Sequence, residues 1–236
     1  MQITYIGHSG FLVEGDSFDL IFDYYRGTLP PLRMDVPKWV FVSHHHEDHF
    51  NPAIFDWKAT YPLLEYVISS DVALRSKENL AEDIHMVKGR ESYLFHQSGS
   101  EIEVKTLKST DCGVAFLIAC NGRTIYHAGD LNLWIWEGET KQYNNDMKAR
   151  FDREMEILKG QKIDVAFVPL DPRQGKDYDK GIEALINTAK LENVFPMHFW
   201  NKKGTVARFI KEQGSEFQKQ GIFVAEVSQE GQHWEV

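Results

Sequence analysis

WVFVSHHHEDH, residues 39–49, joins a run of strand-forming apolar residues to four of the ten histidines in the chain. The apolar half predicts a short buried strand. A strand that ends in imidazoles and carboxylates places polar groups beside a core, which is unfavourable unless something binds them. Imidazole suits Zn, Mn and Fe, and added carboxylate oxygens favour harder ions such as Mn. The segment therefore predicts a metal site.

The spacing within the segment suggests which side chains share an ion. His44 and His46 are two positions apart, so on an extended chain they point to the same side. Asp48 continues this alternation, and His49 follows it directly. Two imidazoles can hold one ion, while the carboxylate and third imidazole can hold a second. His45 is expected to point away, and the alternative for the whole segment is a surface stretch that binds metal only adventitiously.

Further motifs extend the pattern along the chain. Residues 43–49 resemble the His-x-His-x-Asp-His motif of the metallo-β-lactamase superfamily. Residues 126–130, Tyr-His-Ala-Gly-Asp, are similar to its strand that ends in Gly-Asp, and residues 195–198 to its late strand that ends in His. Residues 7–10, Gly-His-Ser-Gly, are similar to the opening of a branch that contains the L-ascorbate-6-phosphate lactonases. These motifs follow the family order, so the resemblance covers most of the chain.

The resemblance implies an α+β fold, a four-layer αβ/βα sandwich with the site at one edge between two sheets. It also implies two divalent metal ions, zinc or manganese, with iron as an alternative. The implied ligands are His44 and His46 for the first metal, Asp48, His49 and His198 for the second, and Asp130 as the bridge between them.

One ligand departs from the family pattern. Many members have a third histidine for the first metal, but residues 108–113, Lys-Ser-Thr-Asp-Cys-Gly, contain none. We expect Asp111 to replace it, which would favour Mn or Fe over Zn. Cys112 is the alternative, and its thiolate would favour Zn. In a third alternative neither residue binds, and the first site is weak or empty.

The implied activity is hydrolysis by a metal-activated hydroxide of a small ester, lactone or phosphate-bearing substrate. Asp48 would orient the hydroxide and accept a proton, and His8 would protonate the leaving group unless its hydrogen bond is structural. Arg173 or Lys176 would hold an anionic substrate, with a solvated loop charge as the alternative. Other open functions are a phosphodiesterase or nuclease, a di-iron redox protein and a non-catalytic metal-binding protein.

The composition limits the classes of partner that we expect. A net charge of -9 weighs against a broad nucleic-acid surface, so a small molecule is the expected partner. The longest apolar run, residues 114–120, is too short to span a membrane, and the first residues do not read as a secretory signal. The two cysteines flank one predicted strand, roughly 26 Å apart at ~3.3 Å per residue, which excludes a disulfide. We expect one cytoplasmic domain over residues 1–236, with a homo-oligomer left open.

Hydrophobic periodicity predicts strands first and alternating helices and strands later. The expected strands are 3–6, 10–14, 18–22, 39–43, 65–69, 84–87, 92–95, 101–107, 114–120, 124–127, 163–170, 194–197, 222–227 and 233–236. The expected helices are one opening at 51–53, 76–82, 144–159, 181–190 and 205–219. Asp23 would form a hydrogen bond with a ligand histidine, and His127 would pack beneath the site. Trp134 and Trp136 would form a pocket wall or pack beneath a helix.

Overall fold

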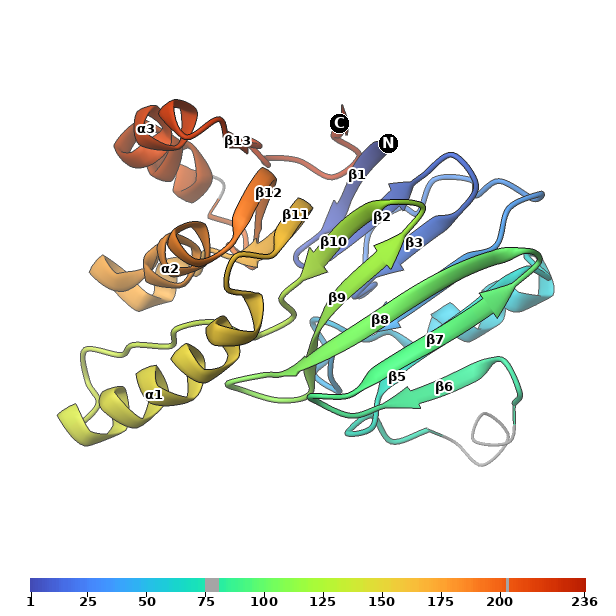
Figure 1. The fold of residues 1–236 in the computed structure, drawn as a ribbon, viewed down its shortest axis with the longest axis horizontal. Coiled ribbons are helices and arrows are strands. Elements are labelled where there is room, and N and C mark those ends of the chain that lie inside the picture. Colours follow the sequence, from blue (N-terminus) through green and yellow to red (C-terminus); the bar gives the residue numbers. More distant parts are fainter. Residues whose placement is uncertain (75–80, 203) are drawn as a thin grey trace.

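Residues 1–74, 81–202 and 204–236 are described by a computed structural model, in which two seven-stranded sheets pack face to face (Figure 1). The first sheet has the order β14-β1-β2-β3-β4-β5-β6. Its strands are β1 (Gln2–Gly7), β2 (Gly10–Glu14), β3 (Asp19–Phe22), β4 (Lys38–Val42), β5 (Leu64–Ser69), β6 (Ile84–Val87) and β14 (His233–Glu235).

The second sheet has the order β13-β12-β11-β10-β9-β8-β7. Its strands are β7 (Ser92–Gln97), β8 (Ser100–Lys108), β9 (Val114–Cys120), β10 (Arg123–His127), β11 (Lys162–Pro169), β12 (Lys190–Met197) and β13 (Phe223–Val224). Aromatic rings join the two sheets, as between Phe11 and Phe167, whose ring centroids are 4.4 Å apart. Such rings dominate the buried area and therefore much of the hydrophobic stabilisation.

Helices α1 (Lys141–Leu158), α2 (Lys180–Thr188) and α3 (Gly204–Lys219) lie on one side of the molecule (Figure 1). Of these, α2 contacts β11, α3 contacts β13, and α1 contacts α2 and β8. The Thr140 hydroxyl caps α1 by accepting a hydrogen bond from the Tyr143 amide. The predicted apolar stripe of α1 is buried, which is why this helix docks on the sheet. The outer face of the first sheet carries the 3-10 helix η1 (Pro52–Ala59), whose Ile54 is buried.

The expected α+β sandwich is confirmed, although its layer outside the first sheet is thin. Among the described helices, none is both long and apolar enough to cross a membrane. Both cysteines are free, as expected.

Most predicted elements are present, and several differ in extent. The strand predicted over 194–197 begins at Lys190, and the helix predicted over 144–159 begins at Lys141. The helix predicted to reach Lys190 ends at Thr188, because β12 begins at Lys190 and pairs with β11 from that residue. The strand predicted over 222–227 is reduced to Phe223–Val224, since the chain turns where the Val227 amide donates to the Ala225 carbonyl. Of the helix predicted over 76–82, residues 76–80 lie outside the described residues.

Candidate metal centre

The histidine segment lies at an edge where the carboxyl ends of several strands meet. Strands β3, β4 and β5 run parallel in the first sheet, and β10, β11 and β12 run parallel in the second. Strand β1 has the direction of β3, because each pairs antiparallel with β2. Parallel strands place their carboxyl ends at the same edge, where ligand-binding loops gather. This topology collects the turns after β1, β3, β4, β10, β11 and β12.

Two glycines bring the second sheet close to the turn after β4. Gly113 and Gly129 have φ values of +67° and +50°, which favour glycine. A Cβ on Gly113 would lie 2.0 Å from the Ser43 carbonyl oxygen, and one on Gly129 would lie 2.6 Å from the Ser43 Cβ. The Val114 amide donates to the same Ser43 carbonyl at 2.9 Å. The backbone before His44 is therefore held directly against β9.

Four side chains from three separate turns form the first group of donors, which we call the buried donor group: His8, Asp48, His49 and His198. Their ligand atoms lie within 4.8 Å of one another. The Oδ2 of Asp48 lies 3.1 Å from His8 Nε2 and 3.7 Å from His198 Nε2. Because the three histidines are buried, this group offers donors in a site of low water content.

His44, His46 and Asp130 form a second group, the adjoining donor group. The Oδ2 of Asp130 lies 3.6 Å from His44 Nε2. Its Oδ1 lies 3.2 Å from His49 Nε2 and 3.3 Å from His198 Nε2. One carboxylate therefore faces both donor groups, as the resemblance implied for Asp130.

The donor atoms themselves test whether a cation fits. Ten buried side-chain atoms have no hydrogen-bond partner among the described residues, and five of them belong to the donor groups: Nε2 of His8, His44, His49 and His198, and Oδ1 of Asp130. Unpaired buried polar atoms are rare and unfavourable, and each one needs an explanation. Imidazole nitrogens and a carboxylate oxygen that converge in this way suit a divalent metal ion. The residues present fit the metals that the motif implies.

Two further aspartates orient these histidines from behind. Nδ1 of His49 donates to Asp23 Oδ2 at 2.7 Å, and Nδ1 of His198 donates to Asp171 Oδ2 at 3.0 Å. Because Nδ1 donates to a carboxylate behind the ring, Nε2 is the nitrogen of each ring that faces the donor groups and would bind a metal. Burial alone would lower the pKa of His49, but Asp130 and Asp23 raise it well above its usual value, so the Nε2 proton would leave when a metal binds. The predicted hydrogen bond from Asp23 is present. Asp171 was not predicted in this role, although an acidic residue directly after a buried strand could have indicated it.

Backbone strain also marks this edge. His8, Asp23 and His198 have φ values of 52°, 39° and 61°, in the left-handed region that side-chain-bearing residues seldom adopt. Such strain persists where the surrounding structure requires it and gathers at functional sites. Here the left-handed backbone turns the side chains of His8, Asp23 and His198 back towards the donor groups.

Burial and charge set the protonation of the donors. Burial lowers the pKa of His8 and of His44 to about 4, so both imidazoles are neutral near pH 7. Burial alone would raise the pKa of Asp130, but the neighbouring imidazoles outweigh it and hold that pKa well below its usual value. Neutral imidazoles and an ionised carboxylate are the forms that bind metal.

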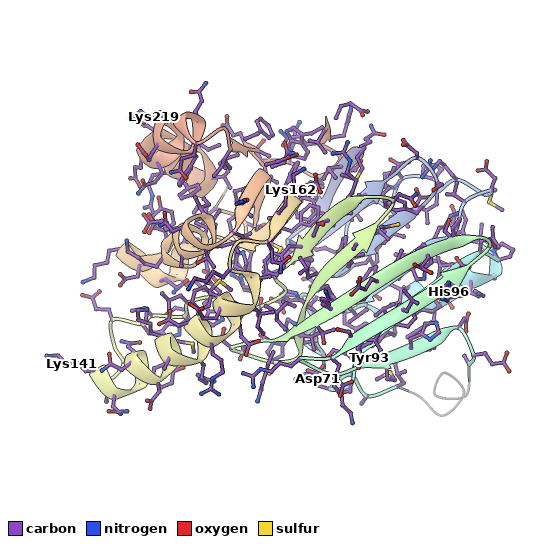
Figure 2. The ribbon with its side chains drawn as sticks, in the orientation of Figure 1. Asp71, Tyr93, His96, Lys141, Lys162 and Lys219 are labelled. Carbon is purple, nitrogen blue, oxygen red and sulfur yellow. The ribbon has the colours of Figure 1, made fainter. Side chains whose placement is uncertain are left out.

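The side chains near the missing histidine are more exposed. Asp111 Oδ2 lies 3.7 Å from His46 Nδ1, but Asp111 belongs to neither donor group. Cys112 instead lies within 4.8 Å of donor atoms on His45 and His46. The replacement of the missing ligand by Asp111 or Cys112 stays a prediction. His45 belongs to neither donor group, and its Nδ1 lies 2.9 Å from Oδ2 of Asp71, which Figure 2 labels.

A pocket of about 400 Å³ opens beside Asp130. Trp134 and Trp136 line it, which agrees with the first of the two alternatives considered for them, and their parallel rings have centroids 6.0 Å apart. Trp134 Nε1 donates to the Asp130 carbonyl at 3.0 Å, which ties this indole to the donor groups. Arg173 lines the pocket, whereas Lys176 does not.

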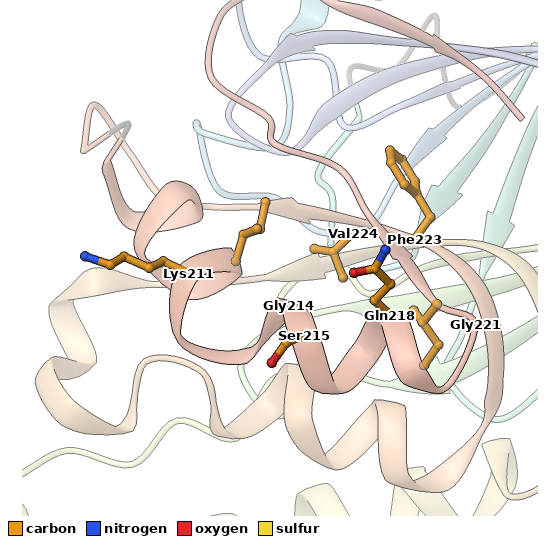
Figure 3. A pocket seen from close by; sticks show the side chains of 9 residues that line it. Lys211, Gly214, Ser215, Gln218, Gly221, Phe223 and Val224 are labelled. Atoms are coloured by element: carbon orange, nitrogen blue, oxygen red, sulfur yellow. The ribbon is translucent and has the colours of Figure 1, made fainter.

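A second pocket, of about 630 Å³, lies between α3 and β13 (Figure 3). Its lining includes Ile210, Gly214 and Phe223 but none of the donor residues. A third pocket, of about 260 Å³, is lined by His8 and Trp200. Both this pocket and the one beside Asp130 reach a donor residue, and the one beside Asp130 is the larger.

Comparison with known proteins agrees with this geometry. A model of the beta-lactamase superfamily domain matches residues 2–198. A UPF0173 metal-dependent hydrolase of Desulforamulus reducens is 27% identical over 212 residues, which cover 84% of each chain. A similarly named protein of Alkaliphilus metalliredigens is 29% identical over 216 residues, covering 84% of this chain and 85% of that one.

Solved structures show the same fold. Igni18, a metallo hydrolase from Ignicoccus hospitalis, has a TM-score of 0.65 and 19% identity over 100% of this chain and 98% of its own. CmlA, a diiron β-hydroxylase from Streptomyces venezuelae, has a TM-score of 0.60 and 9% identity over 94% of this chain and 52% of its own. At these identities the likeness concerns the fold alone.

Proposed function

As a member of the metallo-β-lactamase superfamily, the chain is a metal-dependent hydrolase, and we propose that it cleaves small esters or lactones with two divalent cations, zinc or manganese. The observation that carries the proposal is the meeting of two donor groups at one buried carboxylate, Asp130. His44, His46 and Asp130 would hold one cation. Asp48, His49, His198 and Asp130 would hold the other.

The cations, when bound, would lower the pKa of water and polarise the bond to be cleaved. The protein supplies the proton handling. The pKa of Asp48 is held below its usual value, because the His8 imidazole 3.1 Å away and the other nearby imidazoles outweigh burial. As an ionised carboxylate, Asp48 can orient a water molecule and accept its proton.

His8 is placed to pass that proton on. Its Nε2 lies 3.1 Å from Asp48 Oδ2, within the range over which a proton is shared. Because the imidazole is neutral near pH 7, it can take up a proton from this side and release it to a leaving group. The Trp200 ring, with its centroid 4.7 Å from that of His8, limits the space around the imidazole.

The pocket favours a small substrate. Its volume of about 400 Å³ is typical of sites for small molecules. A net charge of -9 opposes the approach of a long nucleic acid, whose binding depends on cationic contacts. We therefore place esters and lactones ahead of nucleic-acid phosphodiesters.

The test combines metal analysis with a substrate screen. Purified protein should contain zinc or manganese and should cleave lactones or esters in preference to phosphomonoesters and phosphodiesters. Asp130→Ala should lose both bound metal and turnover, whereas Asp164→Ala, which removes a buried carboxylate at the start of β11, should keep its metal.

Other outcomes would contradict the proposal. Full metal content and full turnover in Asp130→Ala would exclude the role of Asp130. Cleavage of phosphodiesters alone would refute the substrate class, and redox-active iron without hydrolysis would favour an oxidative function.

A further inference from the structure

Arg150 differs from the other arginines near the site. It lies on α1 and lines the pocket beside Asp130. One guanidinium nitrogen donates to the Thr110 carbonyl at 3.3 Å, and the other lies 3.8 Å from the Met147 sulfur. Neither partner is charged, and among the described residues Arg150 forms no ion pair. Its charge is therefore available to a ligand.

Arg173, the other cation of the pocket, is already neutralised. Its Nε donates to both oxygens of Asp171, at 3.0 and 2.9 Å, in a bidentate arrangement. Its guanidinium carbon also lies 4.7 Å from the centroid of the Trp200 ring. Asp171 also accepts a hydrogen bond from His198. Arg173 is therefore held by the same carboxylate that orients this donor histidine.

The Arg150 head is held towards the pocket by a chain of hydrogen bonds. Thr110, whose carbonyl accepts from Arg150, donates its hydroxyl to the Asn132 carbonyl at 2.6 Å. Asn132 follows Asp130 by two residues. Arg150 is an exposed residue, and its hydrogen bond to Thr110 places its guanidinium beside the loops that carry Thr110 and Asp130.

The pocket thus offers two chemically different groups. Asp130 faces the donor groups, where divalent cations would balance its charge. Arg150 lines the same pocket, and among the described residues it forms no ion pair. The parallel indoles of Trp134 and Trp136 lie along one wall of the same pocket.

We infer that Arg150 binds an anionic group, carboxylate or phosphate, on the ester or lactone substrate and so selects acidic substrates. The inference rests on the proposed function, because that function places the cleaved bond beside Asp130. A guanidinium binds either anion through two parallel hydrogen bonds, which explains an arginine at this position.

The first test compares matched substrates. A lactone and the same lactone bearing a carboxylate or a phosphate are given to the metal-loaded protein. Arg150→Gln should raise KM for the charged substrate about 10- to 100-fold, the usual range for loss of a charged hydrogen bond. KM for the uncharged substrate should change less than about threefold, and Arg150→Lys should restore part of the difference.

Arg153→Gln is the matched control. Arg153 lies on the same helix, is exposed and does not line the pocket, so its replacement removes the same charge without touching the site. It should change neither KM. Equal effects of Arg150→Gln on charged and uncharged substrates, or an equal loss in Arg153→Gln, would overturn the inference.

A binding measurement separates this inference from the proposed function. Inorganic phosphate and glutarate are titrated calorimetrically into metal-loaded wild type and Arg150→Gln, so that any contact with the metals is common to both proteins. Wild type should bind one of the probes at least tenfold more tightly, and the preferred probe identifies the anion. Equal affinities refute the role of Arg150. An Arg150-dependent affinity in a protein that cleaves no ester or lactone would refute the proposed function alone.

Discussion

The replacement Asp23→Asn should weaken metal binding although Asp23 contacts no metal in our assignment. The Asp23 carboxylate is fully buried and accepts three hydrogen bonds. Its Oδ1 accepts from the Ser43 amide at 2.7 Å, and its Oδ2 accepts from the Ser43 hydroxyl at 2.6 Å and from His49 Nδ1 at 2.7 Å. An asparagine keeps the shape but replaces one acceptor oxygen by a donor.

Either orientation of that amide breaks a contact. If its nitrogen replaces Oδ1, it faces the Ser43 amide, and two donors oppose each other. If its nitrogen replaces Oδ2, it faces Nδ1 of His49, whose proton must then move to Nε2. That proton would occupy the nitrogen that faces Asp130 and would block metal binding.

The magnitude follows from the hydrogen bonds. Loss of one buried hydrogen bond to a charged acceptor costs about 1.5–3 kcal/mol. Changes in carboxylates that orient ligand histidines lower metal affinity about 10- to 100-fold, which corresponds to about 1.4–2.7 kcal/mol. The two ranges overlap, so we expect zinc affinity to fall by this factor.

The assay is a competition titration of zinc against a chromophoric chelator. Asp164→Asn provides the control, because Asp164 is also a buried aspartate that accepts from a backbone amide, that of Thr124 at 2.7 Å. If Asp23→Asn binds zinc within threefold of wild type, or if Asp164→Asn loses as much affinity, the reasoning about His49 is wrong.

Two other replacements test the backbone and the buried imidazole. In urea denaturation, Gly113→Ala should lower the free energy of unfolding by at least about 1 kcal/mol more than Gly122→Ala does. Both glycines have positive φ, but only the Gly113 Cβ would meet neighbouring atoms. Equal losses would show that the close approach to Ser43 is not important. The pKa of His8 is about 4 in the fold against 6.5 for a free histidine, so the unfolded chain binds more protons between these values, and the metal-free protein should lose stability as pH falls from 6.5 to 4. His8→Gln should make this pH slope shallower by up to one proton, about 1.4 kcal/mol per pH unit, and an unchanged slope would contradict the buried neutral imidazole.

Local pattern was sufficient for most of the fold. The strand before His44 and the helix with the stripe Met147, Phe151, Met155 and Leu158 were predictable, because each buries residues at the period of its own secondary structure. The strand predicted over 222–227 was wrong in extent. Its residues favour a strand, but pairing depends on how far β12 offers a partner, which is a long-range property.

The candidate site also contains some residues that a local motif indicates and others that it does not. His44, His46, Asp48 and His49 were indicated by a contiguous motif. Arg150 gave no such indication, because its position near Asp130 depends on how α1 docks against the second sheet. Contacts between elements distant in the chain are not encoded in local spacing.

The two donor groups differ in a way that bears on the missing histidine. The buried donor group has three buried imidazoles, of which two are oriented by aspartates, so few conformations are lost when a metal binds. In the adjoining donor group only His44 is fully buried, and the His46 side chain is 39% exposed. Its third protein ligand is Asp130, which the buried donor group also approaches. The departure from the family motif therefore falls on the more exposed group, where water can complete the coordination. Under the proposed assignment of ligands, His49 and His198 would therefore set metal retention, and the adjoining group, open to the Asp130 pocket, would be where substrate replaces water.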